Sequence, residues 1–423
     1  MRNRVVITGL GVAAPNAVGV PSFSDAIQAG RSGISFQPEL AELKFSCQIG
    51  GIPPVTETIK QQYFTELQLR QLTSSGVIYG VIAGLEAWQN AGLSIATDEP
   101  DWESGIVFGT GLLGIDKIRE SIYKVDAGQV RRLGSTAVVQ TMASGVSAYL
   151  GGIIGCGNQL TANSSACATG TEALLLAYER IANGYAKRML AGSCSDHGPY
   201  MWGGFDAMRV MPYQFNNSPE KASRPLSATA SGFVPGSGAG ALVVESLETA
   251  LERNAPIYAE VLGGHLNSGG QRRGGSMTAP NAFAVKRCIQ KAMEEAAIQP
   301  SDIDVIDGHL TATIKDSAEV TAWCEALGRR GADFPYINSL KSMVGHCLSA
   351  AGSIECVAAV LELHDGFIYP SVNCEDLHPE ISAMIAPDRI PQQLIRKNIN
   401  VIAKANFGFG DVNACVIFKK FQS

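Results

Sequence analysis

Two stretches of the chain decide the fold: QLTANSSACATG at residues 159–170 and PYINSLKSMVGH at residues 335–346. Each begins with a short run typical of a strand, passes through a turn of small residues and opens an apolar helical pattern. Because the two stretches share this order, they predict that the chain consists of two pseudo-equivalent halves.

The helices that follow these turns have matching ends. The first is predicted over residues 165–183 and the second over residues 345–365. Gly184 and Gly366 come directly after them. Glycine commonly terminates a helix because it adopts the left-handed conformation without a steric penalty. The two halves therefore agree in the position and the length of their main helix.

Further segments repeat in the same order. The pairs are RVVITGLGVAAP (4–15) with IYAEVLGGHLNS (257–268), SGIVFGTG (104–111) with IDVIDGHLTAT (303–313), and GAGALVVES (238–246) with NACVIFKKF (413–421). Short β-branched runs alternate with helical patterns rich in Ala and Leu, which indicates an α/β protein with mixed sheets covered by helices. We expect one half over residues 1–250 and the other over residues 251–423; a chance similarity between α/β segments is the alternative.

Composition favours a large buried core and excludes several functions. Hydrophobic residues make up 46% of the 423 residues, charged residues make up 17%, and there are 46 glycines. The net charge of -6 gives no reason to expect nucleic-acid binding. The chain contains no stretch of about 18 apolar residues, so the sequence predicts no membrane span. The start of the chain reads as a strand and turn rather than as a signal peptide.

The cysteines and histidines follow no pattern of a structural site. There are 10 cysteines without a CxxC pair, and 6 histidines without a cluster. This arrangement predicts neither a zinc site nor a disulfide framework, and it fits a reducing compartment. We therefore expect no bound metal and a cytoplasmic location.

Cys167 stands out because it lies in the first turn of a predicted apolar helix, behind Ser164 and Ser165 as candidate caps. Unpaired backbone N–H groups and the positive end of a helix favour a thiolate, which lowers the thiol pKa from about 8.5, and they supply donors for an oxyanion. These conditions predict a reactive thiol. The alternative is a small buried residue without a chemical role.

The second half supplies three candidate partners for this thiol: His309, Lys341 and His346. All three follow apolar strands, and Lys341 and His346 flank the turn into the second long helix. If the halves pack about a pseudo-twofold axis, the N-termini of both helices converge and bring the thiol beside two imidazoles and an ammonium group. Surface or core placement accounts for the other histidines: His197, His265, His364 and His378.

With these motifs in place, the chain resembles the β-ketoacyl-acyl-carrier-protein synthases of the elongating classes I and II, over nearly its whole length. The resemblance is carried by SSACATG, HLTAT, KSMVGHCLSAAG and NFGFGD, with further agreement in ASRPLSATASGFVPGSGAGALVVE, HDGFIYPSVN and VVITGLGVAAP. It implies a thiolase-like fold with five layers, α-β-α-β-α, and a homodimer. It also implies substrates carried on the phosphopantetheine arm of acyl carrier protein, with no cofactor of the enzyme's own.

The resemblance implies a division of roles at the site. Cys167 accepts the acyl group, and His309 and His346 donate hydrogen bonds to the malonyl thioester as carbon dioxide leaves. Lys341 balances charge and orients His309, and Glu319 is the carboxylate expected to pair with Lys341. The backbone N–H groups of Cys167 and Phe409 are the candidate oxyanion hole.

Further positions carry expectations from the same resemblance. Phe409 is expected to gate the acyl channel, with Gly408 and Gly410 allowing its loop to move. Leu112 is expected to line the acyl pocket. Thr311 and Thr313 are expected to bind the pantetheine arm, with loop capping as the alternative. The candidate docking residues for the acidic carrier protein are Arg209, Arg70, Arg272 and Arg273.

Several positions depart from the family pattern. Leu310 replaces the Gly that usually follows the first histidine, and the TATIKDSAE loop is about one residue shorter than usual. Asp411 and Val412 replace a Gly and a Thr, and RPLSATASG has Ser and Ala where the family has charged residues. These changes predict a specialised substrate.

The expected reaction is a decarboxylative Claisen condensation of an acyl thioester with malonyl-acyl carrier protein. A ketosynthase of a dedicated polyketide or polyene pathway is the main alternative. A non-catalytic partner similar to a chain-length factor is disfavoured because the four candidate site residues are retained. A thiolase is disfavoured because NFGFGD contains no second cysteine.

Overall fold

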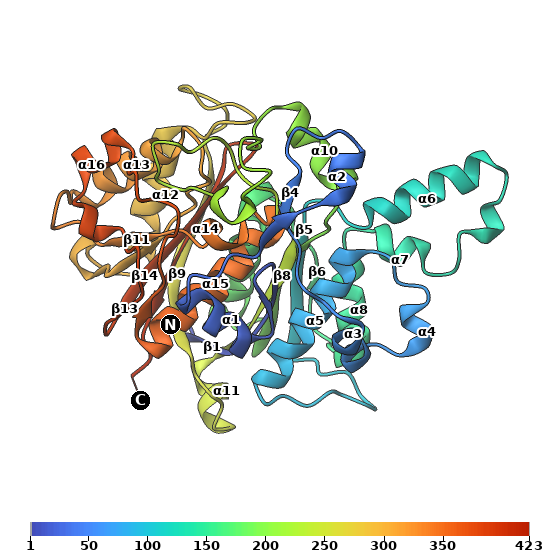
Figure 1. Ribbon diagram of the computed structural model, residues 1–423. Coiled ribbons are helices and arrows are strands. Elements are labelled where there is room, and N and C mark those ends of the chain that lie inside the picture. Colours follow the sequence, from blue (N-terminus) through green and yellow to red (C-terminus); the bar gives the residue numbers. More distant parts are fainter. Residues whose placement is uncertain (1, 423) are drawn as a thin grey trace.

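A computed structural model describes residues 2–422 and places one large sheet between outer helices, with two helices buried between its halves (Figure 1). The strand order is β11-β10-β14-β15-β9-β1-β8-β7-β5-β6, and β2 pairs with β1. The strands of the first half are β1 (Val5–Ala14), β2 (Ala17–Val18), β5 (Ser104–Thr110), β6 (Leu160–Thr161), β7 (Arg188–Ser195) and β8 (Gly238–Ser246). Those of the second half are β9 (Ala259–Ser268), β10 (Val305–Asp307), β11 (Tyr336–Asn338), β14 (Val401–Gly408) and β15 (Val412–Lys419).

The two halves have the same topology. In the first, β1 pairs antiparallel with β8, β8 antiparallel with β7, β7 parallel with β5, and β5 parallel with β6. In the second, β9, β15, β14, β10 and β11 follow one another with the same sequence of antiparallel and parallel pairs. The three pairs of repeated segments in the sequence correspond to β1 and β9, β5 and β10, and β8 and β15. The structure places the two strands of each pair in equivalent positions.

The half-sheets are joined rather than separate. Residues Val5–Ile7 of β1 pair antiparallel with Ala259–Val261 of β9, and this short ladder makes one continuous sheet. Two smaller sheets lie outside it: β3 (Ile34–Phe36) with β4 (Ile49–Gly51), and β12 (Phe367–Ile368) with β13 (Ile395–Arg396).

The central layer consists of α9 (Thr169–Ala182) and α15 (Ala351–Asp365), which touch each other and strands of both halves (Figure 1). They approach closely through glycine. A Cβ on Gly170 would lie 2.1 Å from the backbone nitrogen of Ser353, and one on Gly352 would lie 2.7 Å from that of Thr171. Side chains at these two positions would therefore force the helices apart.

Both central helices begin later than the sequence predicts. Each is preceded by a 3₁₀ turn, η2 (Ala166–Ala168) before α9 and η5 (Leu348–Ala350) before α15. Ala166 and Leu348 have positive φ angles of 49° and 52°, so the chain turns sharply before each helix. The predicted ends are correct, because Gly366 caps α15 in the left-handed conformation and Gly184, with φ of 76°, follows α9.

Outer helices complete the predicted five layers. On the first half lie α5 (Ser75–Asn90) and α8 (Gly145–Ile154), and on the second half lie α12 (Ala282–Glu295) and α13 (Asp316–Leu327) (Figure 1). Strands β8 and β15 face apolar layers on both sides. In β8, Leu242 and Val244 face the central helices whereas Val243 faces the outer ones. This alternation follows from the two-residue period of a strand.

The remaining α-helices of the described residues complete the structure. They are α1 (Val20–Gln28), α2 (Pro38–Glu42), α3 (Glu57–Tyr63), α4 (Glu66–Leu69), α6 (Ile115–Asp126), α7 (Ala137–Thr141), α10 (Pro199–Ala207), α11 (Leu247–Glu252), α14 (Lys341–Val344) and α16 (Pro379–Met384). Helix α6 projects from the body of the molecule, and α7 packs between it and α8 (Figure 1). Within residues 2–422, none of the helices is long and apolar enough to cross a membrane.

Candidate active site

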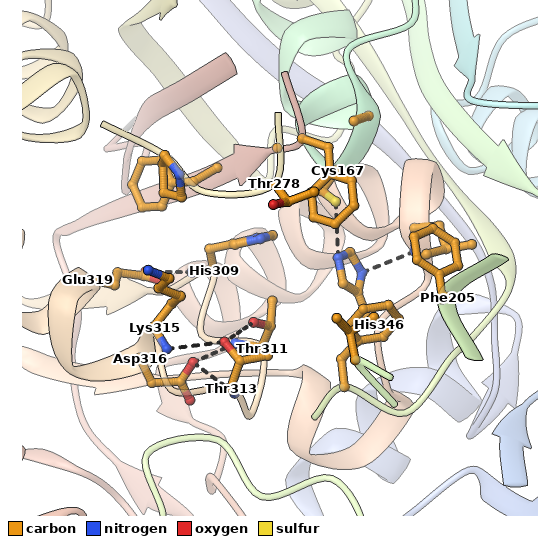
Figure 2. Close-up of a pocket in the computed structure, with 18 of the residues that line it drawn as sticks. Cys167, Phe205, Thr278, His309, Thr311, Thr313, Lys315, Asp316, Glu319 and His346 are labelled. Carbon is orange, nitrogen blue, oxygen red and sulfur yellow. Dashed lines mark hydrogen bonds between the residues drawn. The ribbon is translucent and has the colours of Figure 1, made fainter. Parts of the chain in front are cut away.

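A cavity of about 940 Å³ opens where the N-terminal turns of α9 and α15 meet. Cys167, His309 and His346 lie on its wall, together with Phe205 (Figure 2). Phe233 lines it as well, with its ring 5.2 Å from that of His346. One nitrogen from each histidine and the Cys167 sulfur all lie within 4.8 Å of one another. The structure thus brings together the thiol and the two imidazoles that the sequence placed on opposite halves.

The turn that carries Cys167 is held by a threonine rather than by the serines that the sequence suggested. Thr169 Oγ1 accepts the N–H of Ser165 at 3.0 Å and donates to the carbonyl of Ala166 at 2.6 Å. The facing strand approaches closely at Gly408, where a Cβ would lie 3.1 Å from the Cys167 nitrogen. The prediction of Ser164 or Ser165 as the helix cap was wrong.

The Cys167 thiol is protonated in the free protein. Burial raises its pKa to about 11, although Lys341 and the backbone N–H groups of Phe409 and of Cys167 itself act in the opposite direction. The expectation of a lowered pKa was wrong because the cost of enclosing a thiolate exceeds these stabilising contributions. The same two N–H groups point at the sulfur, where they are placed to serve an oxyanion on an acyl group.

His346 presents a hydrogen-bond donor to the sulfur. Its Nε2 lies 3.1 Å from Cys167 Sγ, and its Nδ1 accepts the backbone N–H of Leu348 at 3.1 Å (Figure 2). The bond at Nδ1 assigns the single proton of the neutral ring to Nε2. Burial and the nearby Lys341 ammonium lower the pKa of His346 to about 3, so the ring is neutral at physiological pH.

His309 is oriented in a similar way. Its Nδ1 lies 3.3 Å from Nδ2 of Asn406. An amide nitrogen can only donate, so Nδ1 accepts and the ring proton is on Nε2. The rings of His309 and His346 are nearly perpendicular, with centroids 5.5 Å apart. Burial, followed by Lys341 and His346, lowers the pKa of His309 well below its usual value. The site therefore contains two neutral imidazoles that donate rather than accept.

Lys341 pairs with Glu355 of α15, not with Glu319. The Lys341 ammonium donates to Glu355 Oε1, and both side chains are buried. Glu319 instead accepts the backbone N–H of His309 at 2.7 Å and that of Leu310 at 2.8 Å. The predicted Lys341–Glu319 pair was wrong, and Glu319 holds the histidine loop through its main chain. Burial raises the pKa of Glu319 to about 7.

The shortened loop after His309 is closed by a second carboxylate. Asp316 accepts the backbone N–H groups of Thr311 at 3.0 Å and of Ala312 at 3.2 Å, and the Thr311 and Thr313 hydroxyls lie 3.1 Å apart on the cavity wall (Figure 2). Leu310, the replacement for the family glycine, is completely buried in the core of the second half. This departure therefore adds packing and leaves the cavity open.

The segment from Gly408 to Asp411, the Phe409 segment, reaches the cavity through Gly408 and Phe409. The Phe409 ring lies 6.2 Å from that of Phe205, and Gly410 donates its N–H to the carbonyl of Met277 at 2.8 Å. The buried Asp411 carboxylate accepts the backbone N–H groups of Gln271 at 2.9 Å and Asn281 at 2.8 Å. This departure from the family pattern ties the Phe409 segment to residues 269–281.

Comparison with known proteins agrees with this geometry. The family models "Beta-ketoacyl synthase, N-terminal domain" and "Beta-ketoacyl synthase, C-terminal domain" match residues 2–250 and 258–375. The chain belongs to the β-ketoacyl synthase family. The resemblance inferred from the sequence motifs is thereby confirmed, as is the thiolase-like fold class, which its solved structural neighbours share.

Individual relatives of this β-ketoacyl synthase match over its full length. It is 32% identical to the chloroplastic 3-oxoacyl-acyl-carrier-protein synthase I of Arabidopsis thaliana, covering 100% of this chain and 87% of that protein. A β-ketoacyl synthase from Burkholderia phymatum STM815 superposes with a TM-score of 0.90 at 28% identity, covering 99% of this chain and 100% of that one. A polyketide ketosynthase bound to its acyl-carrier protein, AntDE:AntF, superposes with a TM-score of 0.87 at 28% identity, with full coverage of both chains.

The remaining predicted positions of the synthase lie at different distances from the cavity. Leu112 and Arg273 line it, and the Arg273 guanidinium lies 5.0 Å from the centre of the Phe283 ring. Arg209 and Arg272 are exposed. Arg70 is exposed at the end of α4, where it pairs with Glu66, and it lies outside the set of lining residues.

Three residues that the sequence reading missed support the site. Glu355 lies in an apolar helix, Lys404 in an apolar strand, and Asn406 two residues further along that strand. All three are buried. Charged residues are seldom fully buried without a partner, so an isolated Glu or Lys within a predicted core element was an available signal.

The cluster of Cys167, His309 and His346 could also hold a soft cation, because a thiolate and two imidazoles are ligands that Zn²⁺ prefers. Binding would require loss of the thiol proton, which the raised pKa of Cys167 opposes. The expectation that this synthase uses no metal rests on the sequence.

Proposed function

We propose that the protein catalyses the decarboxylative condensation of an acyl group held on Cys167 with malonyl-acyl carrier protein, giving a β-ketoacyl-acyl carrier protein. One observation carries the proposal: the Cys167 sulfur lies beside two neutral imidazoles that can each donate a hydrogen bond into the same cavity. A base next to the thiol would favour simple acyl transfer. Paired donors favour an enolate, which needs stabilisation on its oxygen.

In the first half-reaction, Cys167 attacks the thioester carbonyl of the acyl carrier protein. The new carbon–sulfur bond forms as the bond to the carrier sulfur breaks, and the thiol proton of Cys167 ends on the released carrier thiol. The developing oxyanion faces the N–H groups of Cys167 and Phe409. The step consumes no net proton, because the proton that Cys167 loses is returned to the carrier thiolate.

In the second half-reaction, the thioester oxygen of the malonyl group accepts hydrogen bonds from Nε2–H of His309 and of His346. Carbon dioxide leaves, and the electron pair of the broken bond becomes the enolate. Its carbon attacks the acyl thioester, and Cys167 departs as a thiolate that takes a proton from solvent. Loss of one such donor reduces the rate by about 100- to 1,000-fold in comparable sites.

The proposed partner is an acyl carrier protein, which presents the substrate on its phosphopantetheine arm. Thr311 and Thr313 line the cavity together with the exposed Lys315 and Arg273, an arrangement suited to a polar arm on an acidic carrier. The complex of the related polyketide ketosynthase with its acyl-carrier protein supports the same partner class.

We also propose that the active form is a homodimer in the cytoplasm. Strand β6 is the last strand of the large sheet and offers an open edge. The projecting helix α6 and the neighbouring α7 expose Ile122, Tyr123 and Val138 by 54%, 60% and 70%. Exposed apolar side chains and an open sheet edge both favour burial against a second copy.

A ketosynthase of a dedicated polyketide or polyene pathway is the second candidate. The overall likeness to the polyketide ketosynthase supports it. Asp411 supports it as well, because this departure from the family pattern lies two residues from Phe409, which lines the cavity. The two candidates share the chemistry and differ only in the acyl donor.

Intact-mass spectrometry tests both candidates. Purified protein is incubated with a panel of acyl donors on carrier protein and then with malonyl carrier protein. We expect an acyl adduct on the wild type, its loss in Cys167→Ala, and a β-keto product. Preference for short saturated donors supports fatty acid synthesis, and preference for polyunsaturated or β-keto donors supports the alternative. An adduct that persists in Cys167→Ala, or the absence of any product, contradicts the proposal.

A further inference from the structure

Lys404 is a buried cation that the mechanism above does not use. It lies in strand β14, and its side chain is completely buried. Its ammonium lies 2.8 Å from Glu355 Oε2 and 3.4 Å from Asp307 Oδ1, and it donates to the carbonyl of Ala405 at 2.6 Å. Burying an ammonium group is costly unless its charge and all its protons are matched. The three partners meet that condition.

The contacts of Lys404 lead to the active site. Glu355 forms an ion pair with Lys341 through Oε1 and with Lys404 through Oε2, so its carboxylate lies between two cations. Asn406 Nδ2 donates to the same Oε2 at 2.8 Å and lies 3.3 Å from His309 Nδ1. Two side chains, Glu355 and Asn406, therefore separate the Lys404 ammonium from the imidazole ring.

We propose that Lys404 is a positioning residue of the condensing site: its ammonium fixes the Glu355 carboxylate, and Asn406 passes that constraint to the ring of His309. The inference rests on the proposed function, because it assigns Lys404 to the decarboxylation step. Lys404 touches neither the thiol nor the substrate cavity, and its effect reaches the reaction through the orientation of one imidazole.

Charge balance explains why a second lysine is needed. Two ammonium groups, Lys341 and Lys404, face two carboxylates, Glu355 and Asp307, in the same buried cluster. Strands β10 and β14 place Asp307 directly beside Lys404. Without Lys404, Glu355 would be attracted to Lys341 alone, and its Oε2 would lose the cation that holds it near Asn406. The Lys404 charge also helps to keep His309 neutral, because a cation disfavours protonation of a neighbouring imidazole.

The test separates the two half-reactions in the full-length protein. The variants are Lys404→Met, Asn406→Leu and, as a control, Lys117→Met, which removes a buried lysine that pairs with Glu120 outside the cavity. Acyl loading of Cys167 is followed by intact mass, and carbon dioxide release from malonyl carrier protein is followed separately. For Lys404→Met and Asn406→Leu we expect loading within about twofold of wild type and carbon dioxide release reduced on the order of 10- to 100-fold. The control is expected to change neither rate.

Equal loss of both half-reactions in Lys404→Met overturns the inference, since a merely structural role would affect them together. Unchanged carbon dioxide release overturns it as well. Lys404→Met/Asp307→Asn removes one charge of each sign, so it keeps the cluster neutral if the single variant fails to fold. Normal carbon dioxide release by that double variant shows that Lys404 is dispensable. Absence of decarboxylation by the wild type contradicts the proposed function itself, independently of Lys404.

Discussion

The sulfur of Cys167 lies 3.1 Å from Nε2 of His346, although 179 positions separate the two residues in the sequence. The Leu348 N–H at Nδ1 makes Nε2 the protonated nitrogen, so His346 faces the thiol as a donor. An imidazole in this state cannot remove the thiol proton. It is instead prepared to stabilise an oxygen anion that forms next to the sulfur.

His346→Ala should therefore impair decarboxylation more than acyl loading. We expect carbon dioxide release from malonyl carrier protein to fall by about 100- to 1,000-fold, because one of two donors to the enolate oxygen is lost. Loading of Cys167, measured by intact mass, should fall much less. His364→Ala is a suitable control because that histidine is partly exposed near the end of α15 and pairs with Asp365. Equal loss of loading and decarboxylation would contradict this division of roles.

The raised pKa of Glu319 predicts that the rate of decarboxylation depends on pH near neutrality. Burial raises its pKa to about 7, and the ionised carboxylate accepts the N–H groups of both His309 and Leu310. Protonation removes one of these acceptors, so the rate of decarboxylation should rise as pH increases through about 7. The histidines remain neutral over this range, since their pKa values are lowered by burial.

Glu319→Gln tests this assignment. An amide offers one acceptor and a competing donor, so the variant should resemble the protonated enzyme at every pH. We expect a flat profile at the level of the wild-type acid limb, measured as carbon dioxide release between pH 6 and pH 9. Retention of the wild-type inflection in Glu319→Gln would assign it to another group, with Asp316, whose pKa is raised to about 6, as the next candidate.

Asp411 should stabilise the contact between the Phe409 segment and residues 269–281. Asp411 has a φ of 63°, which glycine adopts freely, so Asp411→Gly removes the carboxylate without adding backbone strain. Two buried N–H groups, those of Gln271 and Asn281, lose their acceptor. The free energy of unfolding should fall by about 1 to 3 kcal/mol.

Hydrogen exchange gives the local measurement for this variant. The amides of Gln271 and Asn281 should exchange faster in Asp411→Gly, whereas amides in the central helices should change only with global stability. The control is Asp365→Asn, which removes a carboxylate at a partly exposed position outside this segment. Unchanged exchange at residues 269–281 would show that the carboxylate does not hold this segment.

The fold was predictable from the sequence because its main features leave local patterns. Strand repeats such as 4–15 with 257–268 and the terminating glycines Gly184 and Gly366 follow from backbone preferences of neighbouring residues. The convergence of Cys167 with His346 then follows from pseudosymmetry alone. The sharp turns before the central helices were missed because alanine and leucine at positive φ have no sequence signature.

The chemistry of the site depended on packing that one sequence does not encode locally. Glu319 and Glu355 were both available to Lys341, and the choice between them is made by the way α15 packs beneath the site. The Cys167 pKa was misjudged for a related reason. A helix N-terminus is visible in sequence, whereas the burial of the thiol where its turn packs against β14, β15 and the turn before α15 is not.

The contact between the central helices makes the sharpest prediction about stability. A Cβ at Gly170 would lie 2.1 Å from the Ser353 backbone nitrogen, a separation that requires the two helices to move apart. We expect Gly170→Ala to lower the free energy of unfolding by about 3 kcal/mol or more through overpacking. Because the turn carrying Cys167 directly precedes α9, acyl loading should fall as well.

Gly152→Ala is the matched control. That glycine lies in α8 with open space around its Cβ position, so alanine should stabilise the helix by up to about 1 kcal/mol. Chemical denaturation of both variants measures the two effects with opposite expected signs. A Gly170→Ala variant as stable as wild type would contradict the prediction. It would show that the two helices can accept a methyl group at this contact, and that the contact does not constrain the turn at Cys167.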